Sequence, residues 1–124
     1  FDFLGYHFVG HQHWPREKSL KKLKDTVRAK TKRTDGRSLA VIIADVNVTL
    51  RGWFAYFQHS RRSEFAAVDR FVRQRLRALL RKRSKRRGCA KGWDYHRWRN
   101  AYFTAHGLYS LDAAHATVCQ SLRR

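Results

Sequence analysis

Arginines recur at helical spacing in the middle of the chain: Arg70, Arg73, Arg77 and Arg81. Residues three or four positions apart lie on one face of an α-helix. A guanidinium group can bind two phosphate oxygens at once, and a helix fixes the spacing between successive groups. We therefore predict a helix whose arginines contact the phosphates of a nucleic acid; the alternative is an ordinary solvated face. Arg75 lies off this line, where it would serve packing or contact a second strand.

A second cationic group lies closer to the N-terminus and is richer in lysine, which acts as a mobile point charge. Its members are Lys18, Lys21, Lys22, Arg28 and Lys30, continued by Lys32 and Arg33. A basic run at the end of the arginine helix extends either group, and it contains Lys82, Lys85, Arg86 and Arg87. These side chains are candidate RNA contacts, and the alternative for any one lysine is a solubilising surface charge.

The overall balance of charge favours a polyanionic partner. The 124 residues include 28 Lys and Arg against 9 Asp and Glu, which gives a net charge of +19. Self-repulsion on this scale opposes compaction, and a bound polyanion would offset it. Hydrophobic residues make up 43% of the chain, too many for a disordered basic tail. We expect a folded, basic domain.

The acidic and metal-binding residues argue against catalysis. Two-metal nucleases and polymerases need clustered carboxylates, whereas the acidic residues here are scattered singly. His115 and Cys119 are four residues apart, but Cys89 and His96 would have to complete a zinc site, and the paired spacings of zinc motifs are missing. We predict no catalytic residue, no metal and no cofactor in this chain.

Two further expectations concern the chain as a whole. Its longest apolar run, Leu39 to Ala44, is too short to span a bilayer, so we predict no membrane partner. The chain contains no Met and starts at Phe1 in the middle of a pattern. We expect it to be a fragment of a longer protein.

The elements that position the cationic side chains are mostly helices. Hydrophobic periodicity predicts them over residues 15–30, 39–57, 63–83, 93–105 and 111–122. Pro15 suits the first turn of the first helix, Ser38 and Ser110 are suitable N-caps, and Gly107 is a suitable C-terminal stop.

Residues 1–14 differ from the rest, because apolar and polar or small residues alternate there around two glycines. This pattern predicts a short β-hairpin or a paired extended segment. The predicted fold class is therefore mainly α, a helical bundle with a short N-terminal β-hairpin. We place the domain boundary between residues 14 and 15.

The helix over residues 39–57 is apolar nearly all round. Its main apolar arc includes Trp53, Phe54 and Phe57, which we expect in the core, and its opposite face is also apolar or small. A helix of this kind is buried by neighbours on several sides, so we predict that it is central. Gly52 in its middle suggests a close approach by another helix, or else a tolerated imperfection.

Aromatic residues alternate with arginines in the predicted helix over residues 93–105. The rings are Trp93, Tyr95, Trp98 and Tyr102, interleaved with Arg97 and Arg99. Unpaired bases stack on rings in such surroundings. The helical spacing of the rings makes packing the favoured interpretation.

Three groups of residues together resemble one known family. Phe3, Leu4, Gly5 and Tyr6 resemble the last sequence block of a reverse transcriptase palm. The stretches 50–57 (LRGWFAYF) and 71–83 (FVRQRLRALLRKR) resemble the maturase-specific domain that follows it in group II intron-encoded proteins. The stretches 100–103 (NAYF) and 107–111 (GLYSL) are similar to the ends of bacterial members.

The resemblance implies a thumb, or X, domain of helices that follows a palm segment at residues 1–14 and occupies residues 15–124. It implies binding of the parent group II intron RNA, assistance to its folding and splicing, and a part in intron mobility. It places the hairpin of Phe3, Leu4, Gly5 and Tyr6 near a primer terminus. It further implies a reverse transcriptase parent that needs Mg²⁺, and a cytoplasmic, bacterial ribonucleoprotein.

The chain also departs from the full family pattern. The paired aspartates of the polymerase and the sequence motifs of a His-Asn-His endonuclease are missing. We therefore do not expect this chain to be an enzyme by itself. Our leading hypothesis is an RNA-binding maturase domain. Two alternatives stay open: a thumb that grips an RNA–DNA template–primer duplex, and a generic basic DNA-binding helical domain.

Overall fold

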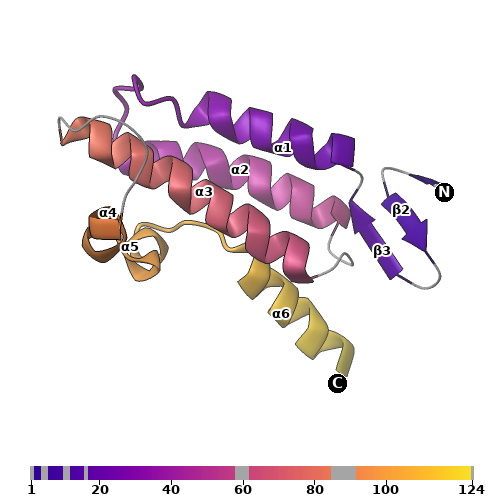
Figure 1. Cartoon of the computed structure of the whole chain (residues 1–124). Helices are drawn as coiled ribbons and strands as arrows, with labels where there is room; N and C mark the ends of the chain where they lie inside the picture. Colours follow the sequence, from indigo (N-terminus) through magenta and orange to yellow (C-terminus); the bar gives the residue numbers. More distant parts are fainter. Residues whose placement is uncertain are drawn as a thin grey trace.

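The computed structural model describes residues 2–3, 6–9, 12–15, 17–57, 62–84 and 92–123. Its helices are α1 (Glu17–Lys30), α2 (Leu39–Phe57), α3 (Arg62–Arg83), α4 (Gly92–Arg97), α5 (Asn100–Ala105) and α6 (Leu111–Arg123). In Figure 1, α1, α2 and α3 lie side by side and alternate in direction, α4 and α5 lie near the C-terminal end of α3, and α6 projects from its other end. The prediction of a mainly helical fold is confirmed.

Three short strands precede the helices: β1 (Asp2–Phe3), β2 (Tyr6–Val9) and β3 (Gln12–Pro15). They are antiparallel in the order β1-β2-β3, so the N-terminal segment is not the single hairpin that was predicted. Pro15 ends β3 opposite Tyr6, and α1 begins at Glu17. The prediction that Pro15 opens the first helix is therefore wrong, since a proline is also tolerated where a strand ends. The domain boundary stays a prediction.

The hydrophobic core lies where α1, α2 and α3 face one another. Each helix has apolar residues three or four positions apart, and each turns that stripe inward. The stripes comprise Leu23 and Val27 of α1, Ile42, Ile43, Val46, Leu50 and Phe54 of α2, and Phe65, Val68, Val72, Leu76 and Leu79 of α3. Burying one such side chain stabilises the fold by about 1.5 to 3 kcal/mol, so packing determines this arrangement. Phe54 and Phe57 are buried as predicted, while Trp53 packs partly buried against the core.

The outer face of α2 differs from the prediction. Val41 and Val48 are 50% and 67% exposed, and Tyr56 is also exposed. A Cβ atom placed on Gly52 would meet nothing within 4 Å, so no helix approaches it closely among the described residues. The described helices cover one side of α2 rather than several. By length and composition alone α2 could also cross a membrane, but the core helix of a bundle has the same properties.

The predicted helix over residues 93–105 is two short helices, α4 and α5, with a break at Trp98 and Arg99. At the break, the carbonyl of Trp98 accepts a hydrogen bond from Arg77 Nε at 2.9 Å, so this carbonyl is paired although the helix does not continue. The end of α5 follows the prediction. Gly107 has a φ of +87°, and Leu108 N donates to Phe103 O at 3.0 Å, which is the pattern of a glycine-terminated helix.

Two buried polar side chains hold the connection between α5 and α6. Asn47 of α2 donates to Gly107 O and accepts from Tyr109 N, both at 2.8 Å. Asp69 of α3 accepts from the backbone N–H groups of Leu111 at 2.9 Å and Asp112 at 3.0 Å. Ser110 caps α6 as predicted, and its hydroxyl also donates to Asp69. Asp69 therefore acts as a second cap supplied from another helix.

Replacing Asp69 by alanine should lower the free energy of unfolding by about 2 kcal/mol, because a lost N-cap costs about 0.5 to 2 kcal/mol and buried donors would be left unpaired. Asp69→Asn keeps one acceptor oxygen, so its free energy of unfolding should fall less than that of Asp69→Ala. Urea denaturation followed by circular dichroism measures both. Equal losses for the two variants would contradict the capping role.

Candidate nucleic-acid interface

The outward face of α1 carries a row of exposed cations. Leu20, Leu23 and Val27 turn toward the core, so the positions between them point to solvent. Lys18, Lys21, Lys22 and Arg28 are all exposed there. The structure thus places these predicted residues together on one helix surface.

An aromatic ring joins this face to α3. Phe71 of α3 is partly buried, and its ring lies 5.6 Å from Lys24 Nζ and 5.1 Å from Arg28 Cζ. Cations over the face of a ring are attracted by its quadrupole. We group the cations of α1 with the adjoining residues of α3 as one basic surface and call it the α1/α3 face: Lys18, Lys21, Lys22, Lys24, Arg28, Phe71 and Arg75.

Arg75 anchors the C-terminal end of α1 to α3. Its guanidinium donates to the Thr31 hydroxyl at 3.1 Å and to the carbonyls of Thr31 and Arg28 at 3.2 and 3.3 Å. Burial lowers the pKa of Arg75, and the neighbouring charges of Arg33 and Arg28 lower it further. Of the two predicted roles for Arg75, the structure shows the packing one. It also shows that like charges are concentrated here, which favours a bound anion.

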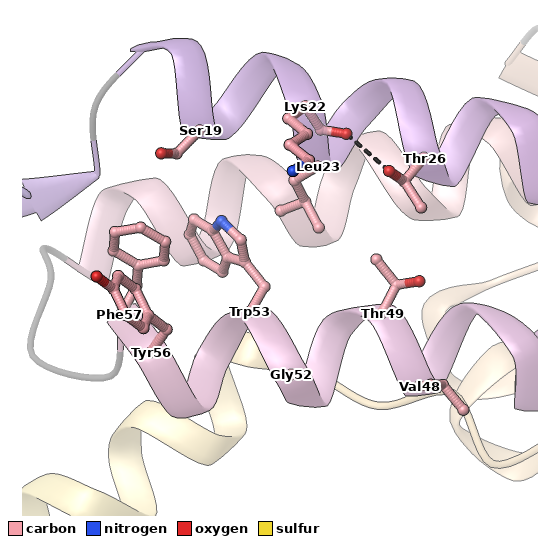
Figure 2. Close-up of a pocket in the computed structure, with 10 residues that line it drawn as sticks. All are labelled: Ser19, Lys22, Leu23, Thr26, Val48, Thr49, Gly52, Trp53, Tyr56 and Phe57. Atoms are coloured by element: carbon pink, nitrogen blue, oxygen red, sulfur yellow. Dashed lines mark hydrogen bonds between the residues drawn. The ribbon is translucent and has the colours of Figure 1, made fainter. Parts of the chain in front are cut away.

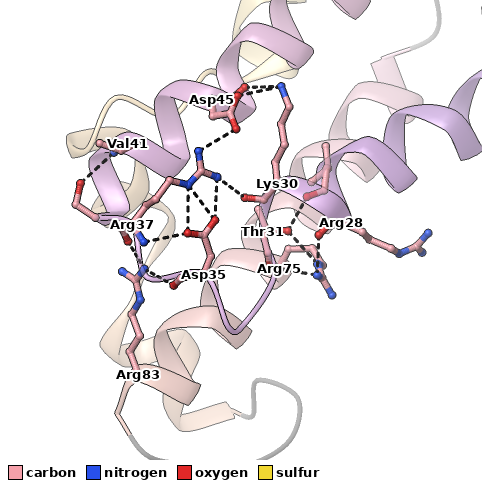
Figure 3. A network of polar contacts seen from close by, with 11 residues as sticks. Arg28, Lys30, Thr31, Asp35, Arg37, Val41, Asp45, Arg75 and Arg83 are labelled. Atoms are coloured by element: carbon pink, nitrogen blue, oxygen red, sulfur yellow. Dashed lines mark hydrogen bonds and ion pairs between the residues drawn. The ribbon is translucent and has the colours of Figure 1, made fainter.

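A network of ion pairs closes the loop between α1 and α2 (Figure 3). Arg37 lies 2.8 Å from Asp35 and 3.2 Å from Asp45, and Lys30 Nζ lies 3.1 Å from Asp45 Oδ1. Arg83 of α3 donates to the carbonyls of Asp35 and Arg37. Lys30, predicted as an RNA contact, is therefore held by a carboxylate. Within the α1/α3 face, Arg28 also pairs with a carboxylate, that of Asp25 at 2.8 Å, but this pair is exposed.

The ion pairs of this network affect the titration of Asp35 and Asp45. The hydrogen bond from Arg37 lowers the pKa of Asp35, and hydrogen bonds from Lys30 and then Arg37 lower that of Asp45. Such depressed carboxylates stabilise the fold above their unfolded pKa, and this contribution is lost as pH falls through the native pKa. Arg37→Gln should raise both pKa values, Asp35 more than Asp45. Lys30→Gln should raise Asp45 alone. Carboxyl ¹³C NMR titrations measure both, and an unchanged Asp35 pKa in Arg37→Gln would contradict the network.

The four arginines of α3 do not share one exposed face. Arg70 is exposed, and Arg73 is half-buried beside a cavity of about 200 Å³ that Asp69 also lines. Arg77 is only 4% exposed, so the prediction that it lies on an open surface is wrong. Arg81 also turns inward, with 11% of its side chain exposed. Arg77 and Arg81 are covered because α4 and α5 fold back over the C-terminal end of α3.

Arg77 connects α3 to the break between α4 and α5. Besides Trp98 O, it donates to Asn100 Oδ1 at 2.8 Å. Its guanidinium lies 4.5 Å from the ring of Tyr95 and 5.3 Å from that of Phe103. Burial lowers its pKa. These contacts give the Arg77 side chain a structural role.

Arg81 forms a buried ion pair with α4. Its Nη1 lies 2.8 Å from Asp94 Oδ2, and the Asp94 side chain is 1% exposed. The pair fixes α4 against the last turns of α3. No sequence pattern had connected these residues, which are thirteen positions apart in different helices.

The other predicted site residues divide into two sets. Lys82 is exposed on the last turn of α3. Lys85, Arg86 and Arg87 lie outside the described residues, as do Leu4 and Gly5; Phe3 and Tyr6 are paired through their backbones, but their side chains are not described. Their roles stay predictions.

Packing accounts for one of the four aromatic candidates. Trp98 is buried in the core, as the packing interpretation predicted, whereas Trp93, Tyr95 and Tyr102 are exposed. Cys119 Sγ lies 3.6 Å from His115 Nε2. Within the described part of the chain, no three His, Cys, Asp or Glu side chains gather as a metal site would require. Cys89 lies outside that part.

Sequence reasoning missed Phe71 and Lys24 as members of the interface. Phe71 looked like one more apolar residue of α3, and only its place beside α1 reveals that it supports two cations. The only signal in the sequence was that Phe71 and Arg75, four residues apart, lie at the edge of the apolar stripe of α3.

Comparison with known proteins is informative at the level of the family. The family model described as group II intron, maturase-specific domain, matches residues 20–103, more than half of the chain. The matched range runs from the first turn of α1 to Phe103 of α5 and so includes the α1/α3 face except Lys18. A search of curated proteins gives no match.

Proposed function

Because the chain belongs to the group II intron maturase-specific domain family, we propose that it binds group II intron RNA through the α1/α3 face and so assists splicing. The observation that supports this most is the concentration of exposed cations on that face, with Lys18, Lys21 and Lys22 in a row. The maturase-specific domain is not itself catalytic. The ribozyme would do the chemistry, and the protein would hold its fold.

The physical mechanism is neutralisation of phosphates. Where two RNA strands approach each other, their charges repel, and cations placed between them remove that cost. Each phosphate contact that releases counterions contributes roughly 0.7 to 0.9 to the salt slope of the affinity. Lysines on a helix surface carry no base information, so recognition would depend on RNA shape.

The arginines that turn inward have a supporting role in this proposal. Arg77 and Arg81 hold α4 and α5 against α3, and Lys30 holds the loop between α1 and α2. Arg70 and Lys82 are exposed and extend the binding surface along α3. We place the complex in a bacterial cytoplasmic ribonucleoprotein that includes the rest of a reverse transcriptase parent.

The test compares probes of equal length and charge. The chain should bind a folded group II intron RNA more tightly than an RNA–DNA hybrid or a DNA duplex at the same salt concentration. Filter binding over a series of salt concentrations gives both affinity and slope. Equal affinity for the hybrid would instead indicate a thumb that grips template and primer, and a preference for duplex DNA would contradict an RNA role.

A further inference from the structure

A groove of about 530 Å³ lies between α1 and α2. Its size is within the usual range for sites that hold small ligands. One wall belongs to α1 and includes Ser19, Lys22 and Thr26. The other belongs to α2, where Trp53 rises from the helix toward α1 and Tyr56 and Phe57 lie beside it (Figure 2).

The aromatic wall is held in place by packing. The ring of Trp53 lies 4.9 Å from that of Phe57 and 6.0 Å from that of Phe65, which is fully buried. Tyr56 meets Phe57 edge to face at 4.8 Å and is about half exposed. Rings fixed in this way make a stacking platform that requires little reordering when a flat ligand binds.

Two features leave the groove ready for a ligand. Gly52 lines it, and a Cβ atom there would meet nothing within 4 Å, so the absence of a side chain keeps the floor open. The indole N–H of Trp53 is buried without a hydrogen-bond partner in the described part of the chain. Buried donors are usually paired, so this N–H is an exception in a residue that lines the groove.

The charge and polarity of the two walls identify the class of ligand. Among the described residues that line the groove, Lys22 is the charged one and none is a carboxylate. Hydroxyls and a cation on one wall face rings on the other. A nucleotide has the same division, with a phosphate and ribose on one side and a flat base on the other. An apolar helix would instead have to bury Lys22 and the hydroxyls.

We propose that this groove takes one unpaired nucleotide of the RNA, with the base stacked on the α2 rings and its phosphate beside Lys22. The inference rests on the proposed RNA binding and adds a specific requirement to it, namely an unstacked base. Proteins that recognise RNA commonly bind bases that have left the helix and stack them on aromatic side chains.

The test uses three short RNA hairpins: one fully paired, one with a single bulged adenosine, and one with an abasic bulge. Stacking of one base on aromatic side chains should make the bulged hairpin bind about tenfold more tightly than the abasic one. Gly52→Leu should remove that preference, because its side chain fills the open floor while leucine favours helix over glycine. Gly52→Ala is the matched control and should keep most of it. Tyr56→Ala should also lose the preference, whereas Tyr56→Phe and the distant Val41→Ala should not.

The outcomes separate this inference from the proposed function. If the wild-type chain binds all three hairpins equally, RNA binding stands and the groove inference is overturned. If the wild-type chain binds neither the three hairpins nor intron RNA, both the proposed function and the groove inference are contradicted. If Gly52→Leu keeps the preference for the bulged base but abolishes binding of an acidic amphipathic peptide, the groove takes protein and the inference is likewise overturned.

Discussion

Replacing Asp94 by alanine is expected to lower the free energy of unfolding by about 3 to 5 kcal/mol, because it removes one partner of a buried ion pair. The Asp94 side chain is 1% exposed and lies 2.8 Å from Arg81, whose own side chain is 11% exposed. Without the carboxylate, the largely buried guanidinium of Arg81 loses the charge partner that lies 2.8 Å away. Urea denaturation followed by circular dichroism measures the loss, and hydrogen exchange should show α4 opening first.

The chain offers a matched control at the same distance. Asp25 and Arg28 also lie 2.8 Å apart, but their side chains are 54% and 50% exposed. Exposed pairs contribute about 0 to 1 kcal/mol, so Asp25→Ala should have little effect although it changes the net charge equally. The double replacement Arg81→Met with Asp94→Leu should recover much of the loss, since well-packed apolar residues can replace a buried pair. Similar losses for Asp94→Ala and Asp25→Ala would contradict the role of burial.

The second large effect concerns RNA affinity. Replacing Lys18, Lys21 and Lys22 together by glutamine should lower the slope of log affinity against log salt by about 2 to 3, because each lost phosphate contact removes roughly 0.7 to 0.9. At ~0.1 M salt this corresponds to a loss of affinity on the order of a hundredfold. Binding to folded intron RNA over a salt series measures both quantities.

The control for this triple lysine variant removes three positive charges from another part of the surface. Arg51, Arg97 and Arg99 are exposed but lie outside the α1/α3 face, so their replacement by glutamine should lower the slope much less. Replacing Arg77 and Arg81 should reduce stability and leave the slope of the folded protein nearly unchanged. If both triple variants lose affinity equally, binding depends on net charge and not on a defined face.

The sequence predicted the long helices and most of the core, because these depend on local periodicity. The Leu20, Leu23 and Val27 stripe of α1 places three lysines on its outer face without any knowledge of the partner helices. The Ser38 and Ser110 caps and the Gly107 stop were similarly readable. In each case a few neighbouring residues contain all the interactions that decide the outcome.

The same reasoning failed on the outer face of α2. A nearly uniform apolar composition predicted neighbours on several sides, yet Val48 is 67% exposed. Composition states how much a helix would gain from being covered, but not whether the rest of the chain supplies the cover. The groove beside Gly52 follows from that difference.

By itself, the sequence determined a basic, mainly helical domain and the lysine face of α1, since charge and helical period are properties of the chain alone. Only the tertiary structure decided which arginines of α3 stay available. Arg70 and Arg77 share a helical face in sequence, but one is exposed and the other lies beneath α4 and α5. That outcome depends on where a distant segment packs and on which carbonyls and carboxylates it brings, and no local pattern contains this information.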